Sequence, residues 1–288
     1  MHPPGRLHII ASARRPEQAQ AIREAGALAL DMDFDRPRPF RQLAGLAPWI
    51  IIAVPPSERH HCQDLRSRAL IAKLRANAGK HQGAAVAKLV YISTTGVFGD
   101  WEGGWIDETA KPRAKQARSL RRLDAEQCFT KAFHAVRLRA PGIYAEDRLP
   151  LRRIQQGLPA IVSDDDSYSN HIHADDLASI AWLSLFRAPP ARLYAVVDNE
   201  PLKMGDWFDH IARCAGLEKL PRAPREAVQA AVNPIMWSFL QESRQIRNHR
   251  MLREIRPKLK AASARDFIDR VFSTPNSPTS SLHTKTSA

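Results

Sequence analysis

The chain has 288 residues, of which 44% are hydrophobic, so it is long and apolar enough for one large domain, or for a domain with a small second lobe, and disorder is not expected. Its formal net charge is +13, but Lys and Arg are spread along the whole sequence without a long basic run, so we expect a solvated basic surface and no nucleic-acid partner. No stretch approaches the roughly 20 consecutive apolar residues of a membrane span, and the N-terminus does not have a signal-peptide pattern. We therefore expect a cytoplasmic protein.

The sequence predicts no metal site and no disulfide. The three cysteines (Cys62, Cys128 and Cys214) are scattered and form no CxxC pair, so reduced thiols are expected. The pairs His60-His61 and His171/His173 have no third ligand at a supporting spacing. Residues 164–166, three aspartates, do not have the oxygen spacing of a calcium loop and are interpreted as a solvated turn.

In the first half of the chain, apolar strand-like runs alternate with longer helical patterns, which is typical of βαβ units and a parallel sheet. We predict a strand at 7–13, a helix that ends at Gly26, and a short strand at 27–30. Residues 49–54 are apolar throughout, as expected for a central strand covered on both faces. A helix near 60–77, a strand at 88–93, a helix around 117–133 and a strand at 135–139 follow.

Beyond Gly142 the pattern becomes less regular, as expected for a substrate lobe inserted among the last elements of such a sheet. An apolar helix is predicted at 177–186, with Asp175 or Asp176 near its N-terminus, where a carboxylate favours the helix dipole. A strand follows at 193–197, and Pro-punctuated helices begin near Pro221. Residues 273–288 are rich in Ser, Thr and Pro and are predicted to be a disordered tail. The predicted units are therefore a core at 7–141, a part with the lobe at 142–272, and the tail.

Five segments, in chain order, carry a resemblance to a known family. They are YISTTGVFG at 91–99, WIDET at 105–109, RLRAPGIY at 137–144, HIHADD at 171–176 and YAVVDNEP at 194–201. Together they resemble the landmarks of extended and atypical short-chain dehydrogenases of the nucleoside-sugar epimerase type, over residues 7–272. The resemblance implies an α/β protein with a Rossmann-like, doubly wound parallel sheet that carries NAD(P), and a small C-terminal lobe that helps to bind a small-molecule substrate.

The resemblance also implies where the cofactor binds. Arg14 and Arg15 stand where an NADP-preferring member grips the 2′-phosphate, which a guanidinium fork suits, so NADP is favoured over NAD; plain surface charge is the alternative. Asp33 would face the adenine amino group, or else cap a strand end. The remaining predicted cofactor-binding residues lie at the carboxyl ends of two further predicted strands: Ala53, Val54 and Pro55 at one, and Ser93 at the other.

The sequence departs from the family at its first strand. There the family has a G-x-G-x-x-G turn whose backbone amides hold the pyrophosphate, and this sequence has no such turn. The strand at 7–13, followed by Arg14, Arg15 and Pro16, matches the family's second strand, so the first βα unit is expected to be missing. Either the strands at 7–13 and 49–54 pair directly, or the natural polypeptide starts upstream of Met1. The unpaired edges left by a deletion favour the second alternative.

A second departure concerns catalysis. The family's Tyr-x-x-x-Lys pair aligns with Arg118 and Arg122, and a guanidinium does not act as a base near neutral pH. Thr94 matches the Ser or Thr that orients a substrate oxygen and is the one catalytic candidate, with a turn residue as the alternative. Tyr91 and Tyr144 are expected to be packing residues. Two functions stay open: an NAD(P)-dependent oxidoreductase or epimerase-like enzyme for a small polar, nucleotide-sugar-like substrate, and a non-catalytic dinucleotide sensor or remnant scaffold.

Overall fold

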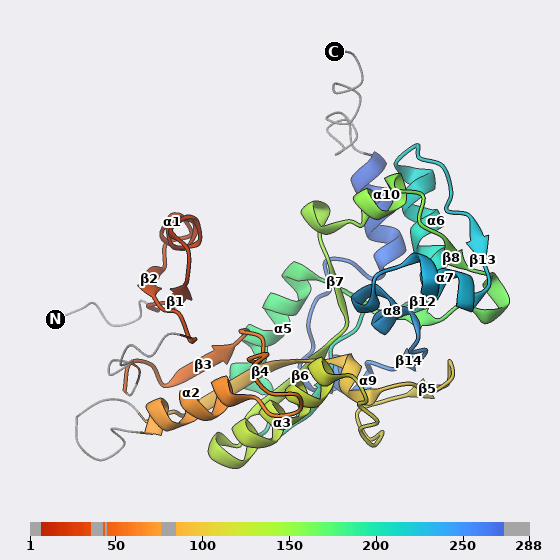
Figure 1. Cartoon of the computed structure of the whole chain (residues 1–288). Helices are drawn as coiled ribbons and strands as arrows, with labels where there is room; N and C mark the ends of the chain where they lie inside the picture. The colour runs from red at the N-terminus through yellow and green to blue at the C-terminus, as the bar shows by residue number, and fades with distance from the viewer. Residues whose placement is uncertain (1–6, 36–42, 44, 76–84, 274–288) are drawn as a thin grey trace.

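A parallel sheet with helices on both faces forms the larger part of the protein (Figure 1). The computed structural model describes residues 7–35, 43, 45–75 and 85–273. The sheet has the order β11-β6-β4-β3, and every pair in it is parallel. Its strands and the helices that cover it are β3 (Trp49–Ile52), α2 (Leu65–Arg75), β4 (Lys88–Thr94), α3 (Ala117–Phe133), β6 (Val136–Ala140), α5 (Ala174–Arg187) and β11 (Leu193–Ala195). The predicted α/β, Rossmann-like class is confirmed.

Strand β4 shows why the sheet is covered twice. Successive side chains of a strand point to opposite faces, so an almost continuous apolar run needs a core on each side. Leu89 and Tyr91 pack in a cluster with residues of α2 and α3, whereas Val90 and Ile92 pack in another with residues of α5. This double covering fixes the strand so that its carboxyl end is held rigidly.

The N-terminal unit consists of β1 (Ile10–Ala13), α1 (Pro16–Glu24) and β2 (Leu28–Asp31), with β1 and β2 paired in parallel. Helix α1 begins at a proline, which suits the first helical position, and Gly26 follows it with a φ of 81°. Among the residues that the structure describes, β1 pairs only with β2, and β3 pairs only with β4. Direct pairing between the strands predicted at 7–13 and 49–54 is therefore not what the structure shows.

The prediction of a central strand at 49–54 is wrong in one respect. Strand β3 lies at the edge of the four-stranded sheet, and Trp49 and Ile51 are 44% and 37% exposed. Nearby, Phe186 of α5 is 52% exposed and contacts the Trp49 ring edge-on. An apolar strand was expected to be covered on both faces, but within the described residues β3 pairs on one side only.

The helix predicted near 60–77 begins later, at Leu65. His60 Nδ1 accepts hydrogen bonds from the backbone N–H groups of Cys62 and Gln63, which closes a turn before the helix. The carboxylate of Asp64 then accepts from the backbone N–H groups of Arg66 and Ser67, the usual work of a residue that caps a helix N-terminus. These side chain to backbone bonds compete with the helical pattern at residues 60–64.

The C-terminal lobe is built from short strands and helices around a second apolar cluster, in which α6 and α10 pack side by side. Its strand pairs are β10 with β7, β12 with β9, β13 with β8 and β14 with β5. The bounds are β5 (Trp105–Ile106), β7 (Gly142–Tyr144), α4 (Leu151–Gln155), β8 (Ala160–Ile161), β9 (Tyr168–Ser169), β10 (His171–His173), β12 (Leu202–Lys203), α6 (Met204–Cys214), β13 (Arg222–Ala223), α7 (Arg225–Ala231), α8 (Pro234–Leu240), β14 (Gln245–Ile246), α9 (His249–Glu254) and α10 (Ala264–Ser273). No helix in the described ranges is long and apolar enough to cross a membrane.

Two further predictions need correction. The aspartates at 164–166 do form a turn, but Asp166 is buried, and its Oδ2 accepts the backbone N–H of Gly205 at 2.7 Å, so the turn is not simply solvated. Ser273, assigned to the tail, is the last residue of α10. The rest of the predicted tail, 274–288, lies outside the described residues.

Candidate functional site

A cavity of about 340 Å³ lies at the carboxyl end of β4, between the sheet and the C-terminal lobe. Ligands of open α/β sheets bind outside the carboxyl ends of the strands, so this cavity lies where the fold predicts a ligand-binding site. Its walls come from the β4 end, from residues 141–144 and 167–171, and from α3, α6 and α8. The lining mixes aromatic rings such as Trp207 and Phe239 with the charged groups of Arg118, Glu242 and Arg244.

Thr94 lies in the cavity wall and also shapes the turn beside it. It precedes the 3₁₀ helix η1 (Thr95–Phe98), and its Oγ1 accepts the backbone N–H of Gly96 at 3.2 Å. A Cβ at Gly96 would lie 2.7 Å from the Ser119 hydroxyl of α3, so this close approach depends on glycine. Both interpretations of Thr94 are therefore compatible with its position: it is a turn residue, and it borders the cavity.

A buried ion pair lies next to the carboxyl end of β4 and contacts it through Ser93. Arg139 of β6 binds Glu126 of α3 through two hydrogen bonds, of 2.8 and 3.0 Å, and the two side chains are 3% and 1% exposed. Ser93, a predicted cofactor-binding residue, is also buried, and its hydroxyl donates to Glu126 Oε1 at 2.5 Å. The Ser93 hydroxyl thus serves the protein interior, and Ser93 does not line the cavity.

Arg118 and Arg122, which the sequence resemblance aligned with a tyrosine and a lysine, have separate structural roles. Arg122 donates to the carbonyl of Ile92 at 2.8 Å and to the Tyr91 hydroxyl at 3.2 Å, which ties α3 to β4. Arg118 borders the cavity, donates to Ser238 of α8, and stacks over the Phe239 ring with 3.7 Å between its Cζ and the ring centre. Burial lowers the pKa of Arg118, but a guanidinium stays charged near neutral pH.

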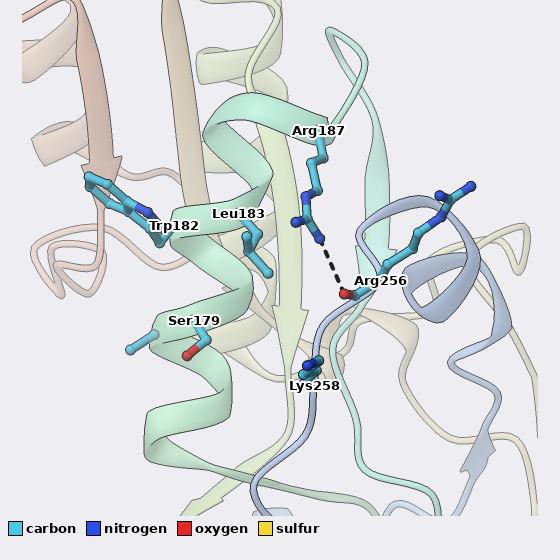
Figure 2. A pocket seen from close by; sticks show the side chains of 7 residues that line it. Ser179, Trp182, Leu183, Arg187, Arg256 and Lys258 are labelled. Atoms are coloured by element: carbon cyan, nitrogen blue, oxygen red, sulfur yellow. Dashed lines mark hydrogen bonds between the residues drawn. The ribbon is translucent and has the colours of Figure 1, made fainter.

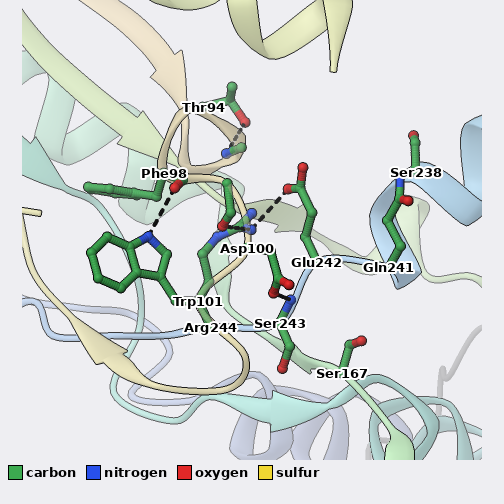
Figure 3. A network of polar contacts seen from close by, with 12 residues as sticks. Thr94, Phe98, Asp100, Trp101, Ser167, Ser238, Gln241, Glu242, Ser243 and Arg244 are labelled. Atoms are coloured by element: carbon green, nitrogen blue, oxygen red, sulfur yellow. Dashed lines mark hydrogen bonds and ion pairs between the residues drawn. The ribbon is translucent and has the colours of Figure 1, made fainter. Parts of the chain in front are cut away.

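Two further lining residues that sequence reasoning missed, Glu242 and Arg244, belong to the segment 241–244 (Figure 3). Arg244 donates to the carbonyl of Gly99 at 2.7 Å and to Glu242 at 3.0 Å, and Asp100 accepts the backbone N–H of Ser243 at 2.8 Å. The segment is thereby fastened to the loop that follows η1. Nothing in its sequence signals this role, because its partners lie about 145 positions earlier in the chain.

The predicted adenosine-side residues lie at other strand ends and not in the cavity. Arg14 and Arg15 are exposed and directly follow β1, while Asp33 follows β2 and its Oδ1 accepts the backbone N–H of Asp35 at 3.0 Å. A hydrogen bond from Arg66 is the main cause that lowers the pKa of Asp35, and the charge of Arg14 adds to it. The carboxylate of Asp35, which follows β2, is therefore surrounded by the positive charges of Arg66, Arg59 and Arg14.

Ala53, Val54 and Pro55 form the loop that follows β3, which ends at Ile52, two residues earlier than predicted. Ala53 and Pro55 are exposed, Val54 is half-buried, and the Pro55 carbonyl accepts a hydrogen bond from Arg66. Because β3 and β4 are parallel neighbours, residues 53–55 and the carboxyl end of β4 lie at the same edge of the four-stranded sheet.

Tyr91 and Tyr144 are both buried, and their positions agree with the packing role expected of them. Tyr91 is 1% exposed, and burial raises its pKa to about 12, so it does not supply a phenolate at neutral pH. Tyr144 is buried against the rings of His173 and Phe267, and burial raises its pKa strongly as well. Within the described residues neither predicted histidine pair joins a third metal ligand.

A larger hollow of about 600 Å³ lies along α5 (Figure 2). It is lined by Trp182, Leu183, Arg187, Arg256 and Lys258, among others, and the Arg187 side chain donates to the carbonyl of Arg256 at 3.2 Å. No residue at the carboxyl end of β3 or β4 borders it. We therefore regard the smaller cavity as the candidate site.

Comparison with known proteins supports the fold. No family model and no curated protein matches the sequence. A conserved protein of unknown function from Silicibacter pomeroyi is 28% identical, with a TM-score of 0.77 over 92% of this chain and 90% of that one. The UDP-glucose 4-epimerase of Thermotoga maritima, solved with UDP-glucose, is 12% identical, with a TM-score of 0.68 over 93% and 98%. The human epimerase family protein SDR39U1, isoform 2, solved with NADPH, is 13% identical, with a TM-score of 0.66 over 93% and 100%. The chain therefore has the fold of these epimerase-type structures.

Proposed function

We propose that this chain is an NAD(P)-dependent, epimerase- or dehydratase-like oxidoreductase. In this proposal the dinucleotide lies along the carboxyl ends of β1, β3 and β4, and a small polar substrate of nucleotide-sugar type occupies the 340 Å³ cavity. The observation that carries the proposal is the coincidence of that cavity with the carboxyl end of a central strand in a fold shared with NADPH- and UDP-glucose-bound proteins. The nicotinamide would supply hydride transfer, and this chain's residues would orient it and the substrate.

We propose NADP(H) as the preferred form. Arg14 and Arg15 are exposed and begin immediately where β1 ends, so their guanidinium groups can reach a phosphate on the adenosine ribose. A charge-assisted hydrogen bond to a phosphate contributes about 1.5–3 kcal/mol, which corresponds to roughly tenfold or more in affinity. Asp33 would contact the adenine, and Ala53, Val54 and Pro55 would pack along the dinucleotide at the end of β3.

We further propose that the pyrophosphate is held by a glycine-rich βα unit, seated between β1 and β3, that the 288 residues do not contain. Supporting observations are the unpaired outer edges of β1 and β3 in the described structure and the exposed apolar side chains beside them, Trp49, Ile51, Trp182 and Phe186. Such a strand would complete the sheet, its helix would cover the apolar side chains, and its turn would supply the backbone amides that a pyrophosphate needs.

Within the cavity, Thr94 is the residue proposed to orient a substrate oxygen. Arg118, which aligns by sequence with the family's catalytic tyrosine, borders the cavity and is engaged with Ser238 and Phe239, so in this proposal no tyrosine and lysine pair supplies a base there. This observation favours a second candidate function, a non-catalytic dinucleotide sensor. Turnover of NADPH or NADP⁺ with nucleotide sugars separates the two: an enzyme converts at least one substrate, and a sensor binds the dinucleotide without turnover.

Isothermal titration with NADPH and NADH tests the binding proposal. NADPH is expected to bind at least about tenfold more tightly than NADH, and the double variant Arg14→Ala, Arg15→Ala is expected to lose that difference. Arg23→Ala is a matched control, since Arg23 is an exposed arginine at the other end of α1. An unchanged ratio of the NADPH and NADH affinities in the double variant would mean that both arginines are plain surface charges. A version extended by the glycine-rich unit is expected to bind NADPH much more tightly, and equal affinity would refute the proposed place of β1.

A further inference from the structure

Three potential metal ligands meet where α6 and α10 pack against each other in the C-terminal lobe. His210 and Cys214 are four residues apart on α6, so their side chains lie on the same face of that helix. Asp269 faces them from α10. His210 is buried, Cys214 is half-buried and Asp269 is half-exposed, so the cluster begins in the lobe's interior and opens to solvent. None of the three lines the candidate cavity.

The distances between the three ligand atoms already suit a bound ion. His210 Nε2 is 3.1 Å from Asp269 Oδ1, Cys214 Sγ is 3.4 Å from the same oxygen, and Sγ is 4.0 Å from Nε2. A tetrahedral zinc ion with ordinary bond lengths separates such ligand atoms by roughly 3.3–3.6 Å. Shifts of a few tenths of an ångström in the side chains therefore seat an ion, with no movement of either helix.

The chemistry of the ligands selects the metal. A thiolate, an imidazole and a carboxylate form the mixed set that Zn²⁺ accepts, whereas Ca²⁺ and Mg²⁺ take oxygen ligands. The thiolate and the carboxylate together neutralise the charge of the ion. Three protein ligands leave the fourth tetrahedral position to water, on the side where Asp269 is exposed.

Two arginines adjoin the cluster, and they differ in how they affect a bound ion. Arg265 is paired with Glu200 at 3.1 Å, so its charge is already compensated. Arg213 Nη2 lies 3.0 Å from His210 Nδ1, but a metal on Nε2 requires a proton on Nδ1, so Arg213 must turn away when the metal binds. Its side chain is 64% exposed and free to do so. Arg213 therefore opposes the metal and supports the metal-free arrangement.

We propose that His210, Cys214 and Asp269 form a three-ligand Zn²⁺ site that fastens α10 to α6. This proposal is independent of the dinucleotide site. The site would also affect the packing of Phe267, which lies two residues before Asp269 on the same helix. The centre of the Phe267 ring is 5.2 Å from that of Tyr144 and 4.7 Å from that of His173. Since Tyr144 borders the candidate cavity, zinc would stiffen one wall of it.

The test is metal binding by the full 288-residue chain, measured by chelator competition with Zn²⁺ and by the absorption spectrum with Co²⁺. One equivalent is expected, with a thiolate-to-cobalt charge-transfer band. Asp269→Asn and Cys214→Ser should each weaken Zn²⁺ binding at least about tenfold, and Cys214→Ser should abolish the band. Arg213→Ala should bind Zn²⁺ at least as tightly as the unaltered chain.

Matched controls come from the other two thiols. Cys62→Ser and Cys128→Ser should leave both the affinity and the cobalt band unchanged, although Cys62 lies 3.9 Å from His60 Nδ1 and is the obvious competing site. Asp269 is exposed enough for its variant to fold, which circular dichroism confirms before titration. No binding, binding that survives both Asp269→Asn and Cys214→Ser, or binding lost only with Cys62→Ser overturns the proposal.

Discussion

Asp198 gives the fold a dependence on pH whose size follows from its surroundings. The side chain is 3% exposed, and burial raises the pKa of this carboxyl from 3.8 to about 8. Its Oδ1 accepts the backbone N–H of Glu200 at 3.3 Å, and its Oδ2 accepts the Tyr144 hydroxyl at 3.4 Å. The folded protein therefore holds the carboxyl protonated over a range in which the unfolded chain has lost the proton.

The sign follows from proton binding in the two states. Below pH 3.8 the group is protonated in both states, and its stabilising contribution is complete; as pH rises from 3.8 to about 8, the contribution is lost. The loss is about 1.4 kcal/mol per pH unit, so between pH 5 and pH 7 it amounts to roughly 3 kcal/mol of unfolding free energy. Asp198→Asn keeps the shape and the hydrogen-bonding capacity but removes the titration.

Urea unfolding of the unaltered chain and of Asp198→Asn at pH 5, 6 and 7 measures this loss. The difference in unfolding free energy between the two proteins should shift by roughly 3 kcal/mol in favour of the variant from pH 5 to pH 7. Asp107→Asn is the control, because hydrogen bonds from Thr109 lower the pKa of Asp107 and keep its titration below this range. A difference that stays constant across the three pH values refutes the reasoning.

Three further predictions concern stability and the site. Glu126→Gln leaves the charge of Arg139 buried without its partner and should lower the unfolding free energy by about 3–5 kcal/mol in urea, and a loss under 1 kcal/mol contradicts this. His171 is buried, and burial lowers its pKa from 6.5 to about 4, so the chain should lose stability as pH falls from 6.5 to 4 and His171→Phe should lose less, as thermal unfolding would show. Thr94→Ala should reduce turnover of a converted substrate about a hundredfold while Thr94→Ser retains it, and equal rates would remove Thr94 from the mechanism.

Much of the fold was predictable because hydrophobic periodicity reports burial directly. The run at 88–93 was predicted to be a strand, and β4 is one, buried on both faces. The run at 49–54 was predicted to be covered on both faces, yet β3 is an exposed edge in the described residues, since a strand's composition does not say which strands pair with it. The helix at 60–77 began later than predicted because a His60 turn and the Asp64 cap were not recognised as competing structure.

The candidate site was predictable only where the family resemblance pointed to the end of a strand. Thr94 was predicted in this way, and it lies in the cavity wall. Arg14, Arg15, Ala53, Val54 and Pro55 were predicted on the same basis and follow β1 and β3, and their role stays a prediction. The remaining walls come from distant segments that only the tertiary fold brings together. The cluster of His210, Cys214 and Asp269 has the same origin: its one local signal is a His and a Cys four residues apart, and its third member is 55 positions away.

Hydrogen–deuterium exchange with and without NADPH tests the central claim most directly, because it locates a bound dinucleotide without assuming where it binds. Slower exchange is expected in three places at once, the backbone after β1 near Arg14 and Arg15, the loop at 53–57 after β3, and residues 94–97 at the end of β4. Protection confined to the hollow along α5 near Trp182 and Arg187, or no protection at saturating NADPH, would contradict the proposal that the carboxyl ends of these strands hold the cofactor.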